Sequence, residues 1–198
     1  QAEVTAPGLK LCIKPEAKYI VANGRYLYVP DGVKVDGAHI LVPVRTLCQA
    51  LGATVTWDDA TSTITIAAGS GPIASGDSFY NSTDLYWLSR IIYAESGNQS
   101  LEGKIAVGNV VLNRVASSLF PNSVYDVIFQ RNQFTPASSG SINREPSEDA
   151  VIAAKLCLDG ANTADNALYF VNPKVSPNSW ASRNCTYVAT IGAHAFFA

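Results

Sequence analysis

The sequence predicts an α+β protein with two α+β domains, a small strand-rich one followed by a larger and more helical one. Residues 18–68 alternate β-rich runs with turn dipeptides, whereas apolar residues from Asn81 onward recur at helical spacing. Between them, "AAGSGPIASGDSF" has the Gly, Ser and Ala composition of a linker. We therefore assign residues 10–68 to the first domain, 69–79 to the linker and 80–198 to the second domain.

The first domain is predicted to be a meander of short strands around one helix. "YIVANGRYLYVPDGVKVDGAHILVPV" carries three turn dipeptides between β-rich runs, Asn23-Gly24, Asp31-Gly32 and Asp36-Gly37. "PVRTLCQALGA" predicts the helix, with Pro43 in its first turn and Gly52 after its end. "TVTWDDATSTITI" then predicts two strands joined by a turn. We interpret Trp57 as a core residue.

The second domain is predicted to contain four helices followed by strands. Its helices are residues 82–95, 100–120, 123–130 and 147–160. The first has Ser or Thr as its N-cap candidate, and Ser147 is expected to cap the fourth. Residues 166–173 predict a strand that a proline ends, and residues 186–197 are expected to be strand or irregular.

Two glycines inside the second of these helices predict close packing. Leu101, Ile105, Gly108, Leu112 and Val115 share one face of it. Each helical glycine costs about 1 kcal/mol relative to alanine. A neighbouring element that approaches the backbone closely explains why glycine stands at Gly103 and Gly108.

The composition excludes several classes of function. The chain has 47% hydrophobic and 15% charged residues and a formal net charge of −2, without a basic cluster, so we expect no nucleic-acid partner. No apolar run approaches the roughly 20 residues of a transmembrane helix. The chain starts at Gln1 and contains no Met, which a removed leader or a trimmed chain would explain, so we expect export.

The four cysteines leave two interpretations open. Cys12 and Cys48 lie in the first half, and Cys157 and Cys185 lie in the second. This division suits one disulfide in each domain of an exported protein. Four buried thiols are the alternative. No C-x-x-C pair occurs and there are only two histidines, so we expect no metal site.

Glu95 is the main candidate for a catalytic residue. It continues the apolar stripe of Leu85, Leu88 and Ile92 and lies near the end of a helix, where the macrodipole disfavours a negative charge. Partial burial would raise its pKa toward that of a general acid. The alternative is an ordinary helix-end acid that faces solvent.

Aromatic residues in the second domain suit a polysaccharide substrate. Sugar rings pack on aromatic faces, and we select Phe134, Tyr169, Phe170 and Trp180 as candidate contacts. Asn172 is a candidate hydrogen-bonding partner for an N-acetyl group or a hydroxyl. Core packing is the alternative for each aromatic side chain, and Trp180, within "SPNSWASRN", is the one expected to be most exposed.

The first domain resembles the small stalk domain named after the N-terminus of copper amine oxidases. The resemblance covers about residues 19–66 and is strongest in "VPVRTLCQALGATVTWDDATSTITI". It implies a spacer or a surface-attachment module of an exported bacterial protein. It does not imply copper, because the sequence has no cluster of histidines.

The second domain resembles the bacterial cell-wall hydrolase family of the spore cortex-lytic enzymes. "LSRIIYAESGNQSLEGKIAVGNVVLNRV", "FPNSVYDVIFQRNQFTP", "ALYFVNP", "SWASRN" and "IGAHAFF" carry the resemblance over nearly all of residues 83–197. It implies a lysozyme-like α+β catalytic domain that needs no cofactor and cleaves peptidoglycan glycan strands. We expect a monomer, secreted or located in the cell wall or spore envelope of a bacterium.

The resemblance assigns the single catalytic glutamate of the family to Glu95. Gln133 and Phe134, within "NQFTP", match a family motif that implies contact with substrate, and Phe134 as a core residue is the alternative. Ser96 is a further candidate, with capping of the turn as the alternative role of its hydroxyl, whereas His194 is interpreted as a core histidine. The resemblance implies a lytic transglycosylase, in which Glu95 serves as acid and then as base and a 1,6-anhydromuramyl end forms. A hydrolytic muramidase and a catalytically inactive wall-binding protein are the alternatives. Glu102 is the only other acid within the motif, and a helix-start acid is the expected role for it.

Overall fold

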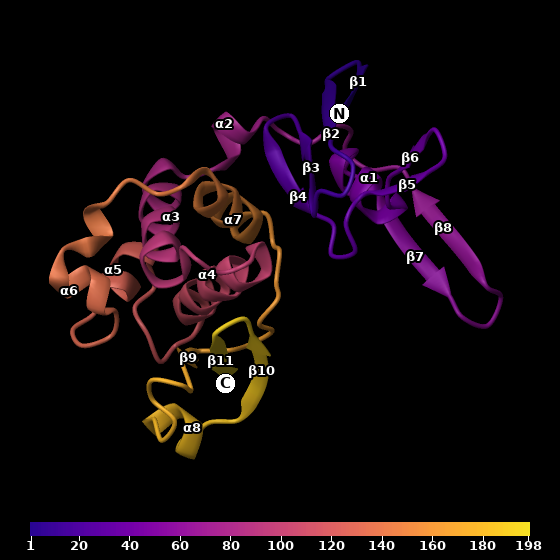
Figure 1. Cartoon of the computed structure of the whole chain (residues 1–198). Helices are drawn as coiled ribbons and strands as arrows, with labels where there is room; N and C mark the ends of the chain where they lie inside the picture. The colour runs from indigo at the N-terminus through magenta and orange to yellow at the C-terminus, as the bar shows by residue number, and fades with distance from the viewer. The chain divides into compact units, whose positions relative to one another are not determined.

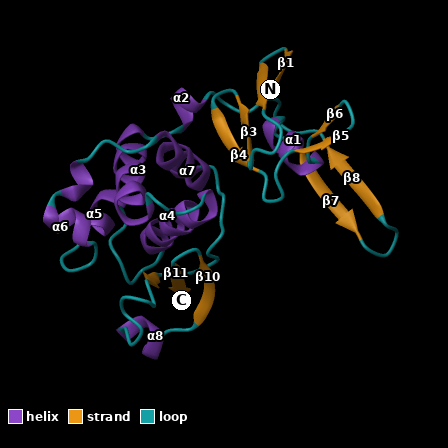
Figure 2. Ribbon diagram, in the orientation of Figure 1, coloured by secondary structure: helices purple, strands orange, loops and turns teal.

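The computed structural model describes all 198 residues and divides the chain into two compact units, Gln1–Phe79 and Tyr80–Ala198 (Figures 1 and 2). Each unit contains helices and strands, so the predicted α+β class is confirmed. No helix combines the length and the apolar character that crossing a membrane requires.

The first unit is built on a four-stranded antiparallel sheet in the order β1-β2-β3-β4. The strands are β1 (Ala2–Ala6), β2 (Leu9–Ile13), β3 (Tyr19–Ala22) and β4 (Arg25–Tyr28). Helix α1 (Val44–Ala50) lies between two hairpins, β5 (Lys34–Asp36) with β6 (His39–Leu41) and β7 (Thr54–Asp58) with β8 (Thr63–Ala67). Ile20 and Leu27 are fully buried in its hydrophobic core.

Two features of this unit differ from the sequence prediction. Strands β1 and β2 were not predicted, because the expected strands lie within residues 18–68; the two pair with each other, and β1 lies ahead of the expected start of the domain. Trp57 is not a core residue: it is 48% exposed on β7, and its indole N–H donates to Asp59. A two-stranded hairpin buries little of either face, which explains why a strand tryptophan is exposed here.

The residues expected to form a linker make hydrogen bonds to the first unit. The Ile73 backbone N–H donates to the Ala50 carbonyl (3.1 Å), and the Asn23 side-chain amide donates to the Ile73 carbonyl (2.9 Å). Residues 76–79 form a short helix, α2 (Gly76–Phe79). Hydrogen bonds of this kind fix a segment that composition alone would leave flexible.

The second unit is mainly helical and carries a three-stranded sheet near its C-terminal end. Its longer helices are α3 (Ser82–Ser96), α4 (Leu101–Ala116), α5 (Val124–Phe129) and α7 (Glu148–Leu158), as the periodicity predicts. The sheet is antiparallel in the order β10-β11-β9, with β9 (Tyr169–Val171), β10 (Tyr187–Ile191) and β11 (His194–Phe197).

Three short helices lie where the sequence gave no helical signal. They are α6 (Thr135–Ser139), the 3₁₀ helix η1 (Ser141–Asn143) and α8 (Trp180–Asn184). Each has five residues or fewer, which is too short for a hydrophobic repeat to show. The N-cap of α3 is also displaced: Asn81, rather than a Ser or Thr, accepts from the first-turn N–H groups. Ser147 caps α7 as predicted.

Helix α4 forms the centre of the second unit, packed against α3, α5 and α7 (Figure 1). Every residue from Gly103 to Val111 is buried, so α4 is covered on all sides rather than on the one predicted face. The predicted close approach occurs at Gly108. A Cβ atom at this position would lie 2.6 Å from the Cys157 sulfur on α7 and 2.9 Å from Ile92 Cδ1 on α3.

All four cysteines are free thiols in the structure, so no disulfide forms in either half. Cys48 and Cys157 are buried, whereas Cys12 and Cys185 are half-buried. The Cys157 thiol donates to the Ile105 carbonyl (3.4 Å), and burial raises its pKa far above the usual range of a thiol. Cys157 is therefore a packing residue of the core.

Candidate functional site

Glu95 lies in the last turn of α3, at the end of the predicted apolar stripe. Leu88 and Ile92 on this stripe are fully buried, and Glu95 itself is half-buried. Burial raises the pKa of the Glu95 carboxyl, because the charged form loses its hydration. Glu95 therefore keeps its proton to a higher pH than an exposed glutamate does.

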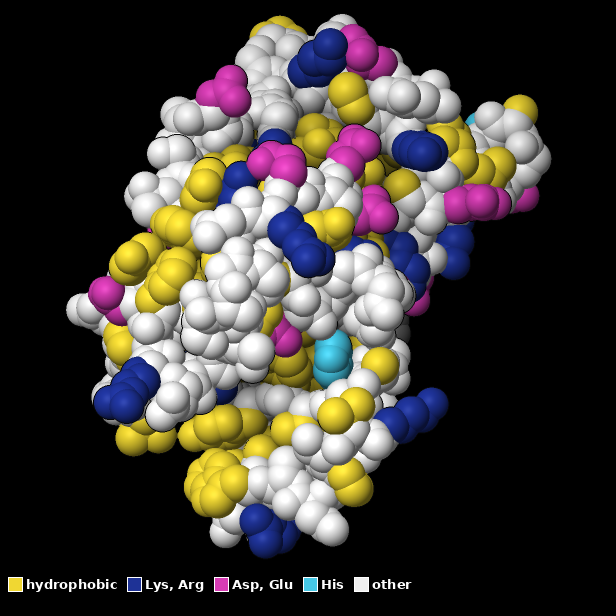
Figure 3. Space-filling view, turned by 60° about the vertical axis from the view of Figure 1, so that its left-hand side comes forward, with side chains coloured by type: hydrophobic (Ala, Val, Ile, Leu, Met, Phe, Trp, Pro, Cys, Tyr) yellow, Lys and Arg dark blue, Asp and Glu magenta, His cyan; other side chains and the backbone are white.

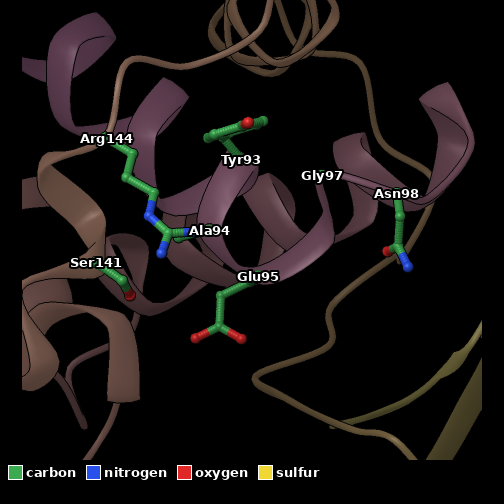
Figure 4. Close-up of a pocket in the computed structure, with 7 residues that line it drawn as sticks. All are labelled: Tyr93, Ala94, Glu95, Gly97, Asn98, Ser141 and Arg144. Carbon is green, nitrogen blue, oxygen red and sulfur yellow. The ribbon is translucent and has the colours of Figure 1, made fainter.

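Two pockets meet at Glu95. We call the first the polar arm; it has a volume of about 380 Å³ and is lined by Tyr93, Ala94, Glu95, Gly97, Asn98, Ser141 and Arg144. We call the second the aromatic arm; it has a volume of about 410 Å³ and is lined by Glu95, Arg114, Gln133, Phe134, Thr135, Tyr169, Phe170, Val171, Ser179, Trp180 and Ala181. In Figure 4 the Glu95 carboxylate projects away from the helix into open space, so it is accessible where the arms join.

The aromatic arm is built by three separate parts of the second unit. Strand β9 supplies Tyr169 and Phe170, helix α8 supplies Trp180, and Phe134 precedes α6. The Tyr169 and Trp180 ring centroids lie 5.5 Å apart in an edge-to-face arrangement, and those of Phe134 and Phe170 lie 6.4 Å apart. Trp180 is 58% exposed, as the sequence predicts for this residue. The space-filling view shows a hollow beside a group of hydrophobic side chains on one face (Figure 3).

The structure brings most of the candidate site residues together and leaves two outside. Besides Glu95, the pocket linings include Gln133, Phe134, Tyr169, Phe170 and Trp180.

Ser96 and Asn172 line neither arm. Ser96 is fully buried, and its hydroxyl donates to the Ile92 carbonyl (2.7 Å). The Asn172 side-chain oxygen accepts from the Lys174 backbone N–H (3.0 Å), so it stabilises the turn after β9.

His194 is buried against the aromatic arm. Its ring centroid lies 5.2 Å from that of Phe170, and burial lowers its pKa. The Nδ1 atom has no hydrogen-bond partner within the chain. His194 is thus a core residue, as interpreted, but its polar atoms are not all satisfied.

Arg114 is a part of the site that sequence reasoning missed. It is 5% exposed, and its Nε donates to the Leu168 carbonyl (2.7 Å) next to β9. Its guanidinium lies 4.8, 5.1 and 5.4 Å from the ring centroids of Phe120, Phe134 and Tyr169. Burial lowers the pKa of Arg114 to about 10, so it stays charged at neutral pH. The only signal for it was an arginine inside the apolar run "VVLNRVA".

Glu95 is the only acidic residue among those that line the two arms. Glu102 lies in the first turn of α4, where its negative charge complements the helix dipole, and it lines neither arm. No group of three or more His, Cys, Asp or Glu side chains is arranged to hold a metal ion. The first unit resembles a domain named after copper amine oxidases, but its residues provide no set of ligands that fits a copper ion.

Comparison with known proteins identifies the family of the second unit. Residues 98–197, half of the chain, match the profile of the cell wall hydrolase family. The chain belongs to the cell wall hydrolase family. The matched range begins three residues after Glu95; it includes every residue that lines the aromatic arm except Glu95, and Asn98, Ser141 and Arg144 of the polar arm. Residues 1–74 match the copper amine oxidase N-terminal domain, a longer range than the resemblance noted in the sequence.

Curated relatives and solved structures from this family are also similar. A spore cortex-lytic enzyme of Oceanobacillus iheyensis is 33% identical over 128 residues, which are 65% of this chain and 46% of that protein. Its counterpart in Bacillus subtilis is 34% identical over 117 residues, which are 59% of this chain and 38% of that protein. The chain thus spans less than half the length of these relatives.

Two solved structures of catalytic domains share the fold of the second unit. One is the catalytic domain of the Bacillus cereus SleB protein, 34% identical with a TM-score of 0.56, which covers 60% of this chain and 92% of that one. The other is the catalytic domain of the germination-specific lytic transglycosylase SleB from Bacillus anthracis. It is 33% identical with a TM-score of 0.57 and covers 64% of this chain and 100% of that one. The predicted family resemblance is therefore confirmed.

Proposed function

We propose that this protein is an enzyme that cleaves the glycan strands of peptidoglycan between N-acetylmuramic acid and N-acetylglucosamine, as a lytic transglycosylase. The observation that supports it most is the position of Glu95, a half-buried carboxyl of raised pKa at the junction of two pockets. A protonated carboxyl beside an accessible groove is the general acid that glycosidic cleavage needs. The names of the relatives make spore cortex peptidoglycan the first substrate to test.

A single carboxylate supports the transglycosylase reaction over two-carboxylate hydrolysis. Retaining glycosidases place a second carboxylate about 5 Å from the first, and inverting enzymes place it about 6.5–9.5 Å away. Glu95 has no acidic neighbour among the pocket-lining residues. In the proposed reaction Glu95 donates its proton to the glycosidic oxygen as the bond to the anomeric carbon breaks, with assistance from the N-acetyl group. The C6 hydroxyl of the muramoyl residue then bonds to the anomeric carbon and returns its proton to Glu95.

The aromatic arm supplies the surface for sugar rings in this proposal. Trp180 and Tyr169 offer exposed or half-buried faces for stacking, and Gln133 lies exposed at the edge of the arm with an amide that can hydrogen-bond an N-acetyl group. Phe134 and Phe170 form the wall behind them. Ser96 and Asn172 hydrogen-bond to the backbone and line neither arm, so the proposal assigns the sugar contacts to the other candidates.

The proposal is tested with Glu95→Gln and purified peptidoglycan. Glu95→Gln should abolish the release of muropeptides while the far-UV circular dichroism and the unfolding transition persist, because glutamine cannot donate the proton. Glu102→Gln is the matched control and should retain activity, since Glu102 lies outside both arms. Mass spectrometry of the wild-type products should show muramyl ends that are one water lighter than reducing ends.

Three results would contradict this proposal. Full activity of Glu95→Gln would refute the role of Glu95. Reducing muramyl ends in place of anhydro ends would show that water is the nucleophile, which is the muramidase reaction. Wild-type protein that sediments with sacculi without releasing any muropeptide would identify a wall-binding protein.

For the first unit we propose a spacer or attachment role at the bacterial wall or spore surface, in a secreted, monomeric protein. Its match to the copper amine oxidase N-terminal domain, which recurs as an appendage of exported proteins, supports this role. Deletion of residues 1–79 should reduce sedimentation with sacculi while turnover of soluble glycan strands persists.

A further inference from the structure

The polar arm carries an unpaired cation beside Glu95. Arg144 and Glu95 are the only charged residues among those that line this arm. Figure 4 shows the Arg144 side chain reaching from its loop toward Ala94 and Glu95, with the Ser141 hydroxyl close to the same space. The Arg144 guanidinium forms no ion pair and no hydrogen bond within the chain.

The backbone of Arg144 is held in place from both sides. Arg144 directly follows η1, and its N–H donates to the carbonyl of Ser141, the first residue of that helix (3.3 Å). The next residue, Glu145, forms an ion pair of 2.7 Å with Arg90 on α3. Arg90 is itself buried, with its guanidinium 3.8 Å from the Tyr86 ring centroid. The loop is thus anchored to the helix that carries Glu95, and this anchor presents a free guanidinium to the arm.

We propose that Arg144 binds a carboxylate carried by the muramoyl residues of the substrate, so that the polar arm selects anionic glycan strands over neutral ones. This inference rests on the proposed function. A guanidinium offers two parallel N–H groups that match a carboxylate, and a neutral sugar gives it no such partner. The muramoyl residue carries a carboxylate on its lactyl group when the peptide stem is absent, and the stem carries carboxylates when it is present.

The arrangement argues against Glu95 as the natural partner of Arg144. The two side chains form no ion pair, and the raised pKa of Glu95 is caused by burial. A guanidinium placed to stabilise the Glu95 carboxylate would lower that pKa. The other arginine of the site, Arg114, is covered by aromatic rings in the aromatic arm. Arg144 is therefore the exposed cation that a substrate carboxylate can reach.

The test compares initial rates on three soluble glycan-strand substrates. The first keeps its peptide stems, the second has been treated with an amidase that leaves lactyl carboxylates, and the third has these carboxylates converted to neutral methylamides. Arg144→Gln should lower kcat/KM about tenfold on the carboxylate-bearing strands, which corresponds to about 1.4 kcal/mol. It should leave the rate on the methylamide strands unchanged. Arg144→Lys should lose less, because it keeps the charge but not the paired N–H groups.

The control is Lys174→Gln, which removes the same net charge from an exposed position outside both arms and should match wild type on all three substrates. A loss on the amidase-treated strands identifies the lactyl carboxylate, and a loss confined to stem-bearing strands identifies the peptide. Equal losses on charged and neutral strands, or a shifted pH–rate profile without discrimination between substrates, would overturn the inference.

Failure of the proposed function would be recognised separately, by a wild-type protein that cleaves none of the substrates. The inference is then tested by fluorescence-anisotropy titrations with labelled stem-bearing, amidase-treated and methylamide strands. Glu95→Gln should bind the anionic strands about tenfold more tightly than the Glu95→Gln, Arg144→Gln double variant. Equal binding of these two proteins would overturn the role of Arg144.

Discussion

Gly108→Ala should destabilise the second unit and also disturb Glu95. Gly108 lies where α4 meets both α3 and α7, and an added Cβ would be 2.6 Å from the Cys157 sulfur and 2.9 Å from Ile92 Cδ1. Carbon–carbon contacts are optimal at about 3.5–4.0 Å, so both neighbours must move away. Ile92 is one turn before Glu95 on α3, and its displacement would shift the carboxyl at the junction of the arms.

The expected size of the effect follows from two opposing contributions. Alanine is favoured over glycine inside a helix by about 1 kcal/mol. Overpacking of a well-packed core costs about 1–3 kcal/mol, and both neighbours here are buried, so the upper part of this range applies. The net loss in the free energy of unfolding should be about 1–2 kcal/mol.

Urea unfolding followed by circular dichroism measures this loss, and the rate of muropeptide release measures the effect on the site. The matched test is Gly108→Ala in a Cys157→Ala background, where the sulfur that makes the closest contact is absent. There the substitution should cost at least about 0.5 kcal/mol less, which is the coupling expected between residues in contact. A Gly108→Ala protein that is more stable than wild type would refute the packing argument.

Two further predictions concern buried charges of the site. Because burial raises the Glu95 pKa, the folded state binds this proton more tightly than the unfolded state, and wild type loses stability as the pH rises from the unfolded pKa through the folded one. The midpoint of urea unfolding at pH 7 should therefore be higher for Glu95→Gln than for wild type, and this difference should vanish below about pH 4. Equal midpoints at pH 7 would contradict the desolvation of Glu95. Arg114→Ala should lower the free energy of unfolding by about 2–4 kcal/mol, because the Leu168 carbonyl loses its donor and three aromatic rings lose their cation. A loss below about 0.5 kcal/mol in urea titrations would show that Arg114 does not support the aromatic arm.

The long helices and the position of Glu95 could be predicted because each depends on local periodicity. The stripe of Leu88, Ile92 and Glu95 needs only the helical repeat, and the cap of α7 needs only Ser147. The glycine at position 108 predicted a close contact with a neighbouring element, but the sequence did not identify Cys157 as the contacting residue. Features confined to one element, or to the steric needs of one residue, can thus be read without tertiary information.

The pocket linings could not be predicted in the same way, because they are formed by residues far apart in the sequence. Arg114 donates to a carbonyl 54 residues away, and Glu145 anchors its loop through Arg90, 55 residues away. Helix α8 is too short for a periodic signal, so Trp180 was expected in a loop or at a strand edge. Apart from Glu95, no residue of the polar arm was predicted, since Ser141 and Arg144 occur in an ordinary polar segment.

Because burial is the cause of the raised Glu95 pKa, this pKa should change as substrate binds and departs. The desolvation that raises the Glu95 pKa increases as a sugar chain displaces water from both arms. Binding should thus raise the pKa of Glu95 further and favour the protonated form when the glycosidic oxygen is in place. Once the glycosidic bond has broken and the leaving strand departs, water can re-enter the arms. The free-energy cost of the charged Glu95 carboxylate is then lower. In the proposed transglycosylase reaction, a single glutamate would in this way alternate between acid and base without a second carboxylate.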